Sequence, residues 1–145
     1  LEGEISLPLP PYSSYKIKGK PLFQWAREGK LSEIKIPMRQ TKINSAEMLS
    51  LGKVSGKKLL SAIEQKISLI KGDFRQKEIL AKWQKVLSGN KNDYQIAKIK
   101  ISCSSGTYIR SVAHYLGKEL KTGAVLLGLK RTRVGNFDIK NSLRI

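Results

Sequence analysis

The change of apolar periodicity between residues 96 and 120 restricts the fold of this chain more than any other sequence feature. Over residues 96–103, small or apolar side chains alternate with polar ones at a period of two, which is typical of a half-buried β-strand. A turn containing Ser and Gly follows at residues 104–107, and apolar residues then recur at helical spacing. This apolar stripe consists of Ile109, Val112, Ala113, Leu116 and Leu120. We expect Gly117 to weaken the helix without ending it. A strand, a tight turn and an amphipathic helix in direct succession predict a helix packed beside a sheet.

Two further regions predict helices. Residues 21–28 begin with Pro21, which suits a first helical turn, and are followed by Gly29, which suits a helix stop. Residues 57–88 predict two helices around a turn at Gly72, because apolar residues recur there at helical spacing. The two stripes consist of Leu60, Ile63, Ile67 and Ile70, and of Leu80, Trp83 and Leu87. The stop signal after the second helix consists of Gly89 and Asn90. The lysine-rich face of these helices is predicted to be solvated surface, with RNA contact as the alternative.

Three segments predict extended structure. Leu1–Pro11 contains three prolines, which exclude a helix, and we expect an extended segment without a strand of its own. Residues 33–51 predict an edge strand that is broken at Pro37. Residues 125–134 predict a strand that ends in a basic cluster. Since helices and strands alternate without a repeat, we expect one domain of the α+β (mixed α/β) class.

The charge of the chain points to a polyanionic partner. Lys and Arg number 28 against 11 Asp and Glu, for a formal net charge of +17 over 145 residues. Clustered cations bind phosphate backbones by releasing condensed counterions, so nucleic acid is the leading class of partner. The alternative is that the surplus lysine only maintains solubility.

Cysteine and histidine are too few for a metal cluster or an internal disulfide. Cys103 is the single cysteine and His114 the single histidine, which excludes zinc-ribbon modules and predicts no metal and no cofactor. His114 is expected on a helix surface. The sequence has no long uncharged apolar run of the kind found in membrane helices or signal peptides, so we predict no membrane partner and a location in the reducing cytoplasm.

Arg110 has an unusual position for a cation. It falls in the first turn of the predicted helix, where unpaired N–H groups and the helix dipole already make the potential positive. A guanidinium in this position is stabilised by an anion, because its planar fork binds a carboxylate or a phosphate bidentately. An exposed arginine would tolerate the same position, because the unfavourable interaction with the helix dipole costs at most several tenths of a kcal/mol. These two interpretations are equally supported by the residues alone.

Three motifs resemble those of the TruB family of tRNA pseudouridine synthases, in the order of that family. Cys103–Ser111 reads CSSGTYIRS and resembles its CSKGTYIRT-type motif. Pro11–Lys16 reads PYSSYK and resembles P-x-Y-S-A-x-K, and the GKPLF and AREG runs within Gly19–Gly29 resemble GK-x-LYE-x-AREG. Toward the other end, Gly123–Ala124 and Leu129–Gly135, which reads LKRTRVG, resemble CGAH…LRRTRVG. Residues 57–88 would then be a helical insertion found in some members.

The resemblance implies an enzyme that isomerises the T-loop uridine at position 55 of tRNA to pseudouridine without a metal or cofactor. In the family an aspartate attacks the nucleoside and an arginine pairs with it, and Arg110 holds the arginine position. Tyr12 would stack on the extruded base, Tyr108 would line the pocket, and Leu129 would form part of an apolar wall. Each of these three also has an ordinary structural interpretation as a packed residue. The expected phosphate contacts are Lys16, Lys130, Arg131 and Arg133.

The nucleophile of the family is absent from these residues. It belongs to a GxxDPxATG-type motif, which does not occur here, and the only aspartates are Asp73, Asp93 and Asp138. Asp93 is expected in a polar loop before a strand, and all three are predicted to have loop or capping roles. We therefore expect residues 1–145 to be the C-terminal portion of the catalytic domain, without an appended RNA-binding domain. Such a chain would be inactive until the N-terminal half supplied the aspartate.

Other functions remain alternatives. A non-catalytic module could use the same pocket to bind tRNA, or to act on tRNA as a folding chaperone. A relation to the guide-RNA-dependent branch of the superfamily is less favoured, because the match over Tyr12–Gly29 resembles the stand-alone bacterial enzymes. A ribosome-associated basic protein would not explain the motifs.

Overall fold

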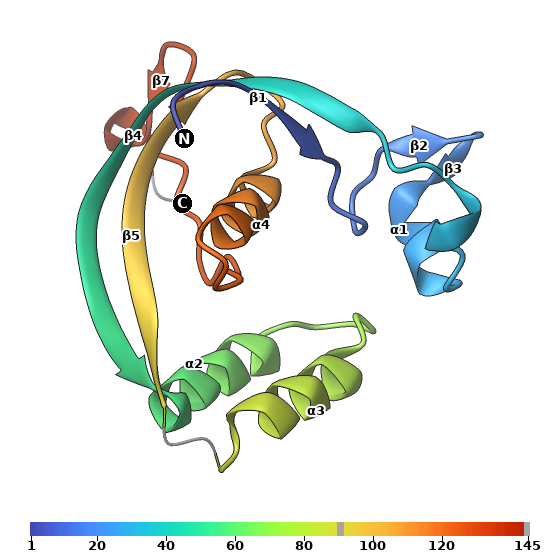
Figure 1. The fold of residues 1–145 in the computed structure, drawn as a ribbon, viewed down its shortest axis with the longest axis vertical. Helices are drawn as coiled ribbons and strands as arrows, with labels where there is room; N and C mark the ends of the chain where they lie inside the picture. The colour runs from blue at the N-terminus through green and yellow to red at the C-terminus, as the bar shows by residue number, and fades with distance from the viewer. Residues whose placement is uncertain (90–91, 144–145) are drawn as a thin grey trace. The chain divides into compact units, whose positions relative to one another are not determined.

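The computed structural model describes residues 1–89 and 92–143. These residues form two compact units (Figure 1). The first unit comprises Leu1–Ser45 with Ser102–Ile145, and the second comprises Ala46–Ile101. The expected α+β class is confirmed, because antiparallel strands and several helices make up the chain.

A three-stranded sheet has the order β1-β4-β5. Strand β1 (Gly3–Pro8) pairs antiparallel with β4 (Met38–Ser55), with a register that runs from Gly3 opposite Ile43 to Pro8 opposite Met38. Two predictions were therefore wrong. The proline-rich start does form a strand, because β1 lies at a sheet edge, where a proline that lacks an N–H group is tolerated. The strand predicted at residues 33–51 begins after Pro37 without a break, and it is the central strand of the sheet.

The segment after β1 folds into a small hairpin and a helix. Strands β2 (Lys16–Ile17) and β3 (Lys20–Pro21) pair antiparallel around Lys18 and Gly19, both of which have positive φ. Helix α1 (Leu22–Arg27) follows, as predicted, and buries Leu22 completely. A short 3-10 helix, η1 (Leu31–Glu33), precedes β4.

Helix α4 (Ile109–Glu119) confirms the strand-turn-helix prediction, since it follows β5 (Asp93–Cys103) after a tight turn. His114 is exposed on this helix, as expected. Leu120 does not continue the apolar stripe, because it is the C-cap residue and is 62% exposed. Gly117 is buried and does not end the helix. A Cβ atom at this position would lie 2.7 Å from the Cβ atom of Ala124, so the glycine permits the close approach of the segment that follows.

The C-terminal region has less strand structure than predicted. Only Arg133–Val134 (β6) of residues 125–134 forms a strand, and it pairs with β7 (Phe137–Asp138). In the described part of the chain, residues 124–132 pair with no strand, and an apolar run without a pairing partner does not form a sheet. A second 3-10 helix, η2 (Ile139–Asn141), follows.

The second unit contains the two predicted helices. Helix α2 (Gly56–Ser68) and helix α3 (Gln76–Leu87) pack against each other on either side of Gly72. The N-cap hydroxyl of Ser55 accepts a hydrogen bond from the Lys58 backbone N–H at 3.4 Å. The buried side chains of the pair are Leu59, Ile63 and Leu87. Ile70 lies beyond the end of α2 and is exposed, whereas of the predicted stop only Gly89 is described and Asn90 lies outside the described residues.

Candidate functional site

A network of hydroxyl groups holds the turn that leads into α4. The Thr41 hydroxyl, which is 5% exposed, lies 3.1 Å from the Ser104 Oγ atom and makes a short hydrogen bond with the Thr107 hydroxyl. The backbone N–H of Ser104 donates to the Lys42 carbonyl at 2.9 Å, and the Thr107 hydroxyl donates to the Ser104 carbonyl at 2.8 Å. Strand β4 therefore positions the turn through side chains as well as backbone.

The first turn of α4 also contacts the segment that follows β1. Nη2 of Arg110 donates to the backbone carbonyl of Tyr12 at 3.0 Å, although the two residues are 98 positions apart. The buried Ser111 hydroxyl donates to the Pro8 carbonyl at 2.6 Å. The first of these hydrogen bonds joins two of the motifs, and the second joins α4 to the end of β1.

A small, shallow depression lies beside these contacts. Its walls come from β1 and the residue after it, from β4, and from the start of α4. Tyr108, the N-cap residue of α4, lines it together with Thr107 and Ser111. Its lining residues are Leu7, Pro8, Leu9, Arg39, Thr41, Thr107, Tyr108 and Ser111. The surface that the depression exposes is apolar and no carboxylate of the described residues lines it, so it offers no site for a cation.

Arg110 has no acidic partner among residues 1–89 and 92–143. Asp73 accepts a hydrogen bond from the Arg75 backbone N–H at 3.3 Å, and Asp138 accepts one from the Lys140 backbone N–H at 2.8 Å. The predicted loop or capping roles are thus confirmed: Asp138 is the N-cap residue of η2, and Asp73 lies in the loop before α3. Asp93 is the first residue of β5, so its predicted location in a loop was wrong.

The other expected site residues lie at exposed positions. Tyr12 is 44% exposed and Leu129 is 60% exposed. Among the described residues, no side-chain hydrogen bond or ion pair joins Lys16, Lys130 or Arg131 to Arg110. The four expected phosphate contacts are all exposed: Lys16 in β2, Lys130 and Arg131 before β6, and Arg133, whose Nε atom donates to the Gly135 carbonyl at 2.9 Å. The structure thus brings together Tyr12, Arg110 and Tyr108, and it leaves the expected phosphate contacts open to solvent.

Polar contacts around α1 fix the motif that follows Tyr12. Lys20 makes a short ion pair with Glu28, and its Nζ atom lies 4.5 Å from the centroid of the Trp25 ring. The hydrogen bond from Lys20 lowers the pKa of the Glu28 carboxyl, with smaller contributions from the charges of Lys20 and Lys30. The indole N–H of Trp25 donates to the Ile17 carbonyl at 3.3 Å. This motif therefore has a structural role next to the candidate site.

Three residues of the site were missed by sequence reasoning. Thr41 shares an alternating strand face with the apolar Ile43, so a polar residue there was the available signal. Ser111 lies outside the predicted apolar stripe of the helix and gave no such signal, although it is buried. Arg39 gave no such signal, because an arginine in a basic chain is unremarkable by composition. Its position is evident only from the depression and from Gly106.

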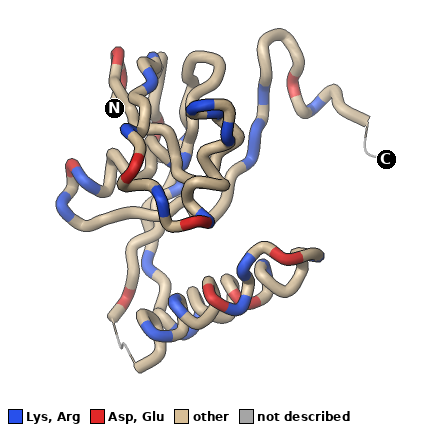
Figure 2. Tube along the Cα trace, turned by 90° about the vertical axis from the view of Figure 1, so that its right-hand side faces the viewer, with Lys and Arg blue, Asp and Glu red and all other residues tan. Residues whose placement is uncertain are grey.

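The described residues contain no group of His, Cys, Asp and Glu that could hold a metal ion. None of the helices in this part of the chain combines the length and the apolar character needed to cross a membrane. Lys and Arg are spread over both units and outnumber Asp and Glu (Figure 2). The electrostatics of the chain are thus dominated by fixed cations.

Comparison with known proteins identifies the family. The model of the TruB family pseudouridylate synthase (N terminal domain) matches residues 1–109. The tRNA pseudouridine synthase B of Endomicrobium trichonymphae is 41% identical over 99% of the chain, and that of Caldicellulosiruptor saccharolyticus is 32% identical over 97%. The corresponding protein of Francisella tularensis subsp. novicida is 30% identical over 99% of the chain.

The chain spans only 33–44% of the length of these three relatives. The matching family model describes an N-terminal domain, so the expectation that the chain is a C-terminal part is not confirmed by the match. The model covers three quarters of the chain, including the motif at Tyr12 and residues 103–109 of the motif at Tyr108. This protein therefore belongs to the TruB family of pseudouridylate synthases.

Proposed function

We propose that this chain forms the uridine pocket of a tRNA pseudouridine synthase, and that the nucleophilic aspartate comes from residues outside these 145. The observation that carries the proposal is the hydrogen bond from Arg110 to the Tyr12 carbonyl at 3.0 Å. It joins the arginine of one motif to the aromatic residue of another, across 98 positions of sequence. The function of the named relatives, tRNA pseudouridine synthase B, supports the choice of tRNA as substrate.

Arg110 has the donors that this role requires. A guanidinium carries five N–H donors, and the Tyr12 carbonyl accepts from Nη2. The remaining donors face no acidic side chain among the described residues. A carboxylate placed beside them would stay ionised, because an adjacent positive charge lowers the pKa of an acid. It would also be held in one orientation for attack on the nucleoside.

Tyr12 would provide the stacking surface for the base. Extruding a base from its stack costs a few kcal/mol, and stacking on an aromatic side chain recovers about 1–3 kcal/mol. Tyr12 is 44% exposed, so part of its surface is open to a ligand. Tyr108 lines the adjacent depression and would contact the nucleotide, whereas Leu129 would add an apolar wall.

The exposed cations would bind the RNA backbone. Lys16, Lys130, Arg131 and Arg133 are exposed, and phosphate contacts orient an RNA without reading its sequence. Net positive charge also speeds the encounter with a polyanion. Activity on tRNA implies a location in the cytoplasm, and the chemistry assigned to these residues requires no metal or cofactor.

The domain assignment follows from the same proposal. Residues 1–145 would be the part of the catalytic domain that follows the nucleophile motif, with α2 and α3 as a helical insertion. The partner would then be a polypeptide that carries the GxxDPxATG-type motif. The absence of this motif from the 145 residues supports the assignment.

Complementation tests the proposal. The chain is mixed with a polypeptide that carries the upstream motif of the family, and pseudouridine in a tRNA transcript is measured. We expect product from the mixture and none from either part alone. Arg110→Lys keeps the charge but loses the planar fork, and we expect it to lower the rate by about 100-fold or more, since it misplaces a reacting group. The matched control is Arg27→Lys, because Arg27 is an exposed arginine that lies over the Phe23 ring at 5.6 Å.

Two outcomes would decide against the proposal. A folded complex that binds tRNA and makes no pseudouridine would favour the non-catalytic RNA-binding module. In that case tRNA affinity should change little in Arg110→Ala. Equal rates for Arg110→Lys and the wild-type chain would show that the guanidinium has no part in the reaction.

A further inference from the structure

Arg39 lies over the one glycine of the motif turn. Gly106 has a φ of +76°, and a Cβ atom built on it would lie 2.7 Å from Cζ and 3.2 Å from Nε of Arg39. No side chain fits between the two. Gly106 therefore serves the turn in two ways: it adopts the left-handed conformation, and it leaves room for the guanidinium.

The position of Arg39 is set by the sheet. Side chains alternate along a strand, so Arg39 shares a face of β4 with Thr41, which binds the hydroxyl groups of the same turn. Leu7 of β1 is the cross-strand partner of Arg39, and both residues line the depression. The Arg39 side chain is therefore restricted by its neighbours before any ligand binds. This restriction lowers the conformational entropy that the side chain loses on binding.

The guanidinium itself is uncompensated. Within residues 1–89 and 92–143, no hydrogen bond or ion pair involves the side chain of Arg39, and no carboxylate lines the depression beside it. Arg39 is exposed, and Tyr108 and Ser111 line the same depression. A preplaced guanidinium beside a pocket, without an internal anion, is arranged to receive one from a ligand.

We propose that Arg39 binds a backbone phosphate of the RNA next to the nucleotide that occupies the pocket. This inference rests on the proposed function, because it takes RNA as the ligand. A phosphate is the anion that every nucleotide carries, and an arginine fork binds its oxygens bidentately. Arg39 is then a positioning residue: it sets the register of the strand at the pocket, whereas Arg110 orients the attacking carboxylate.

RNA binding by the 145-residue chain tests the inference. Dissociation constants are measured for a T-arm stem-loop and for a hairpin of unrelated sequence, at several salt concentrations from about 50 to 200 mM. Three variants are compared with the wild-type chain: Arg39→Gln, Arg39→Lys and Lys42→Gln. Lys42→Gln is the matched control, since Lys42 lies on the opposite face of the same strand, across from Glu4, and loses the same charge. Far-UV circular dichroism verifies that each variant is folded.

We expect Arg39→Gln to weaken binding of both RNAs by about tenfold, because a charge-assisted contact is lost. The plot of log association constant against log salt concentration should also become less steep by about 0.7–0.9, which is the contribution of one phosphate contact. Arg39→Lys should keep the slope, because it keeps the charge. Lys42→Gln should change both quantities much less.

Three results would overturn the inference in different ways. Equal effects of Arg39→Gln and Lys42→Gln would mean that Arg39 contributes only to the general positive field. A loss confined to the T-arm stem-loop would indicate contact with a base in place of a phosphate. No RNA binding by the wild-type chain at low salt would overturn the RNA-binding part of the proposed function as well, which separates the two failures.

Discussion

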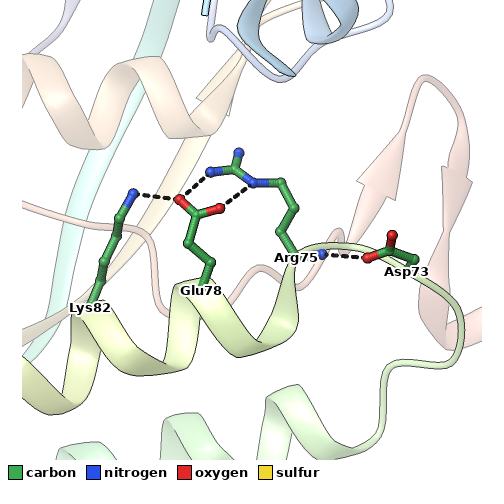
Figure 3. Close-up of polar contacts among 4 residues, drawn as sticks. All are labelled: Asp73, Arg75, Glu78 and Lys82. Atoms are coloured by element: carbon green, nitrogen blue, oxygen red, sulfur yellow. Dashed lines mark hydrogen bonds and ion pairs between the residues drawn. The ribbon is translucent and has the colours of Figure 1, made fainter. Parts of the chain in front are cut away.

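The side-chain contacts within the first unit differ in kind from those within the second unit. In the first unit, the hydrogen bonds of the site join residues far apart in sequence: Ser111 to Pro8 over 103 positions, and Thr41 to Ser104 over 63. In the second unit, most side-chain contacts join near neighbours. Glu78 accepts from Nε and Nη2 of Arg75 at 2.7 and 2.5 Å and from Nζ of Lys82 at 2.7 Å (Figure 3).

The two kinds of contact should contribute differently to the free energy of unfolding. Local contacts order few residues and can form as soon as the helix does, so a change in one of them has a local effect. Long-range contacts in the first unit depend on the whole sheet and helix arrangement, because each one closes a long loop. Substitutions that remove the buried long-range contacts of the first unit should therefore change the global free energy of unfolding, and substitutions of the exposed local contacts in the second unit should not.

The largest contrast is expected between two leucines. Leu22 of α1 is 0% exposed and Leu69, the C-cap residue of α2, is 80% exposed. Leu22→Ala should lower the free energy of unfolding by about 2–5 kcal/mol, because it removes buried methyl groups and leaves a cavity. Leu69→Ala should change it by less than about 0.5 kcal/mol. Urea denaturation of the two variants measures both values, and equal losses would contradict the difference in burial between the two leucines.

A smaller contrast is expected between two serines. Ser111→Ala leaves the Pro8 carbonyl without its donor at a buried position, at a cost of about 1–3 kcal/mol. Ser68 donates to the Gln65 carbonyl at 2.8 Å at an exposed position, where water replaces the bond, so Ser68→Ala should be nearly neutral. Ser111→Ala should also lower tRNA affinity, because it releases the segment next to Tyr12. Loss of stability without any loss of affinity would show that this bond supports the fold alone.

A third contrast uses two glycines that lack a positive φ. Alanine at Gly117 would place its Cβ atom 2.7 Å from the Ala124 Cβ atom and closer still to neighbouring backbone, whereas nothing lies within 4 Å of the same atom at Gly52. Gly117→Ala should cost about 1–3 kcal/mol through overpacking, even though alanine is the better helix former. Gly52→Ala should be neutral or stabilising by up to about 1 kcal/mol. Thermal unfolding followed by circular dichroism distinguishes them, and a stabilised Gly117→Ala would mean that the C-terminal segment moves aside freely.

The same distinction explains which parts of the fold were predictable from sequence. Helices α2 and α3 were predicted correctly, because their apolar residues recur at helical spacing and their contacts are local. Strand β5 was also predicted correctly, because its side chains alternate along the sequence with a period of two. The central position of β4 was not, since pairing partners far away in sequence decide it. The strand predicted at residues 125–134 failed because an apolar run does not indicate whether a partner strand exists.

The main residues of the candidate site were predictable from the sequence, but the hydrogen bonds that hold them in place were not. The motifs around Tyr12 and Arg110 were recognised by their resemblance to a family, and that resemblance carried more information than charge or periodicity. Thr41 belongs to none of these motifs, and Ser111 is the last residue of one, but neither residue was assigned a role in holding the motifs in place. Their contribution arises from hydrogen bonds that form only in the folded chain.

The smallest expected effect concerns the pH dependence of the second unit. The hydrogen bond from Arg75, followed by that from Lys82, lowers the pKa of the Glu78 carboxyl from its ordinary value of 4.5 to about 2. Because the pKa is lower in the folded state, the stabilisation is complete above the ordinary value, and it is lost as the pH falls from there toward about 2. The group is exposed, so the effect should be small and should decrease further with added salt.

Glu78→Gln provides the measurement for this effect. At about pH 6 the variant should be slightly less stable than the wild-type chain, and the difference should diminish as the pH falls toward about 2, where Glu78 is protonated in the unfolded state and partly protonated in the folded state. The helical signal during urea denaturation at several pH values reports the difference. A gap that stays constant with pH would show that the carboxylate charge contributes nothing, and that the network of Arg75, Glu78 and Lys82 acts through packing. In that case the order of the helices in the second unit would be attributed to the packing of α2 against α3, together with the hydrogen bond from Gln84 to Glu64, and not to the local ion pairs.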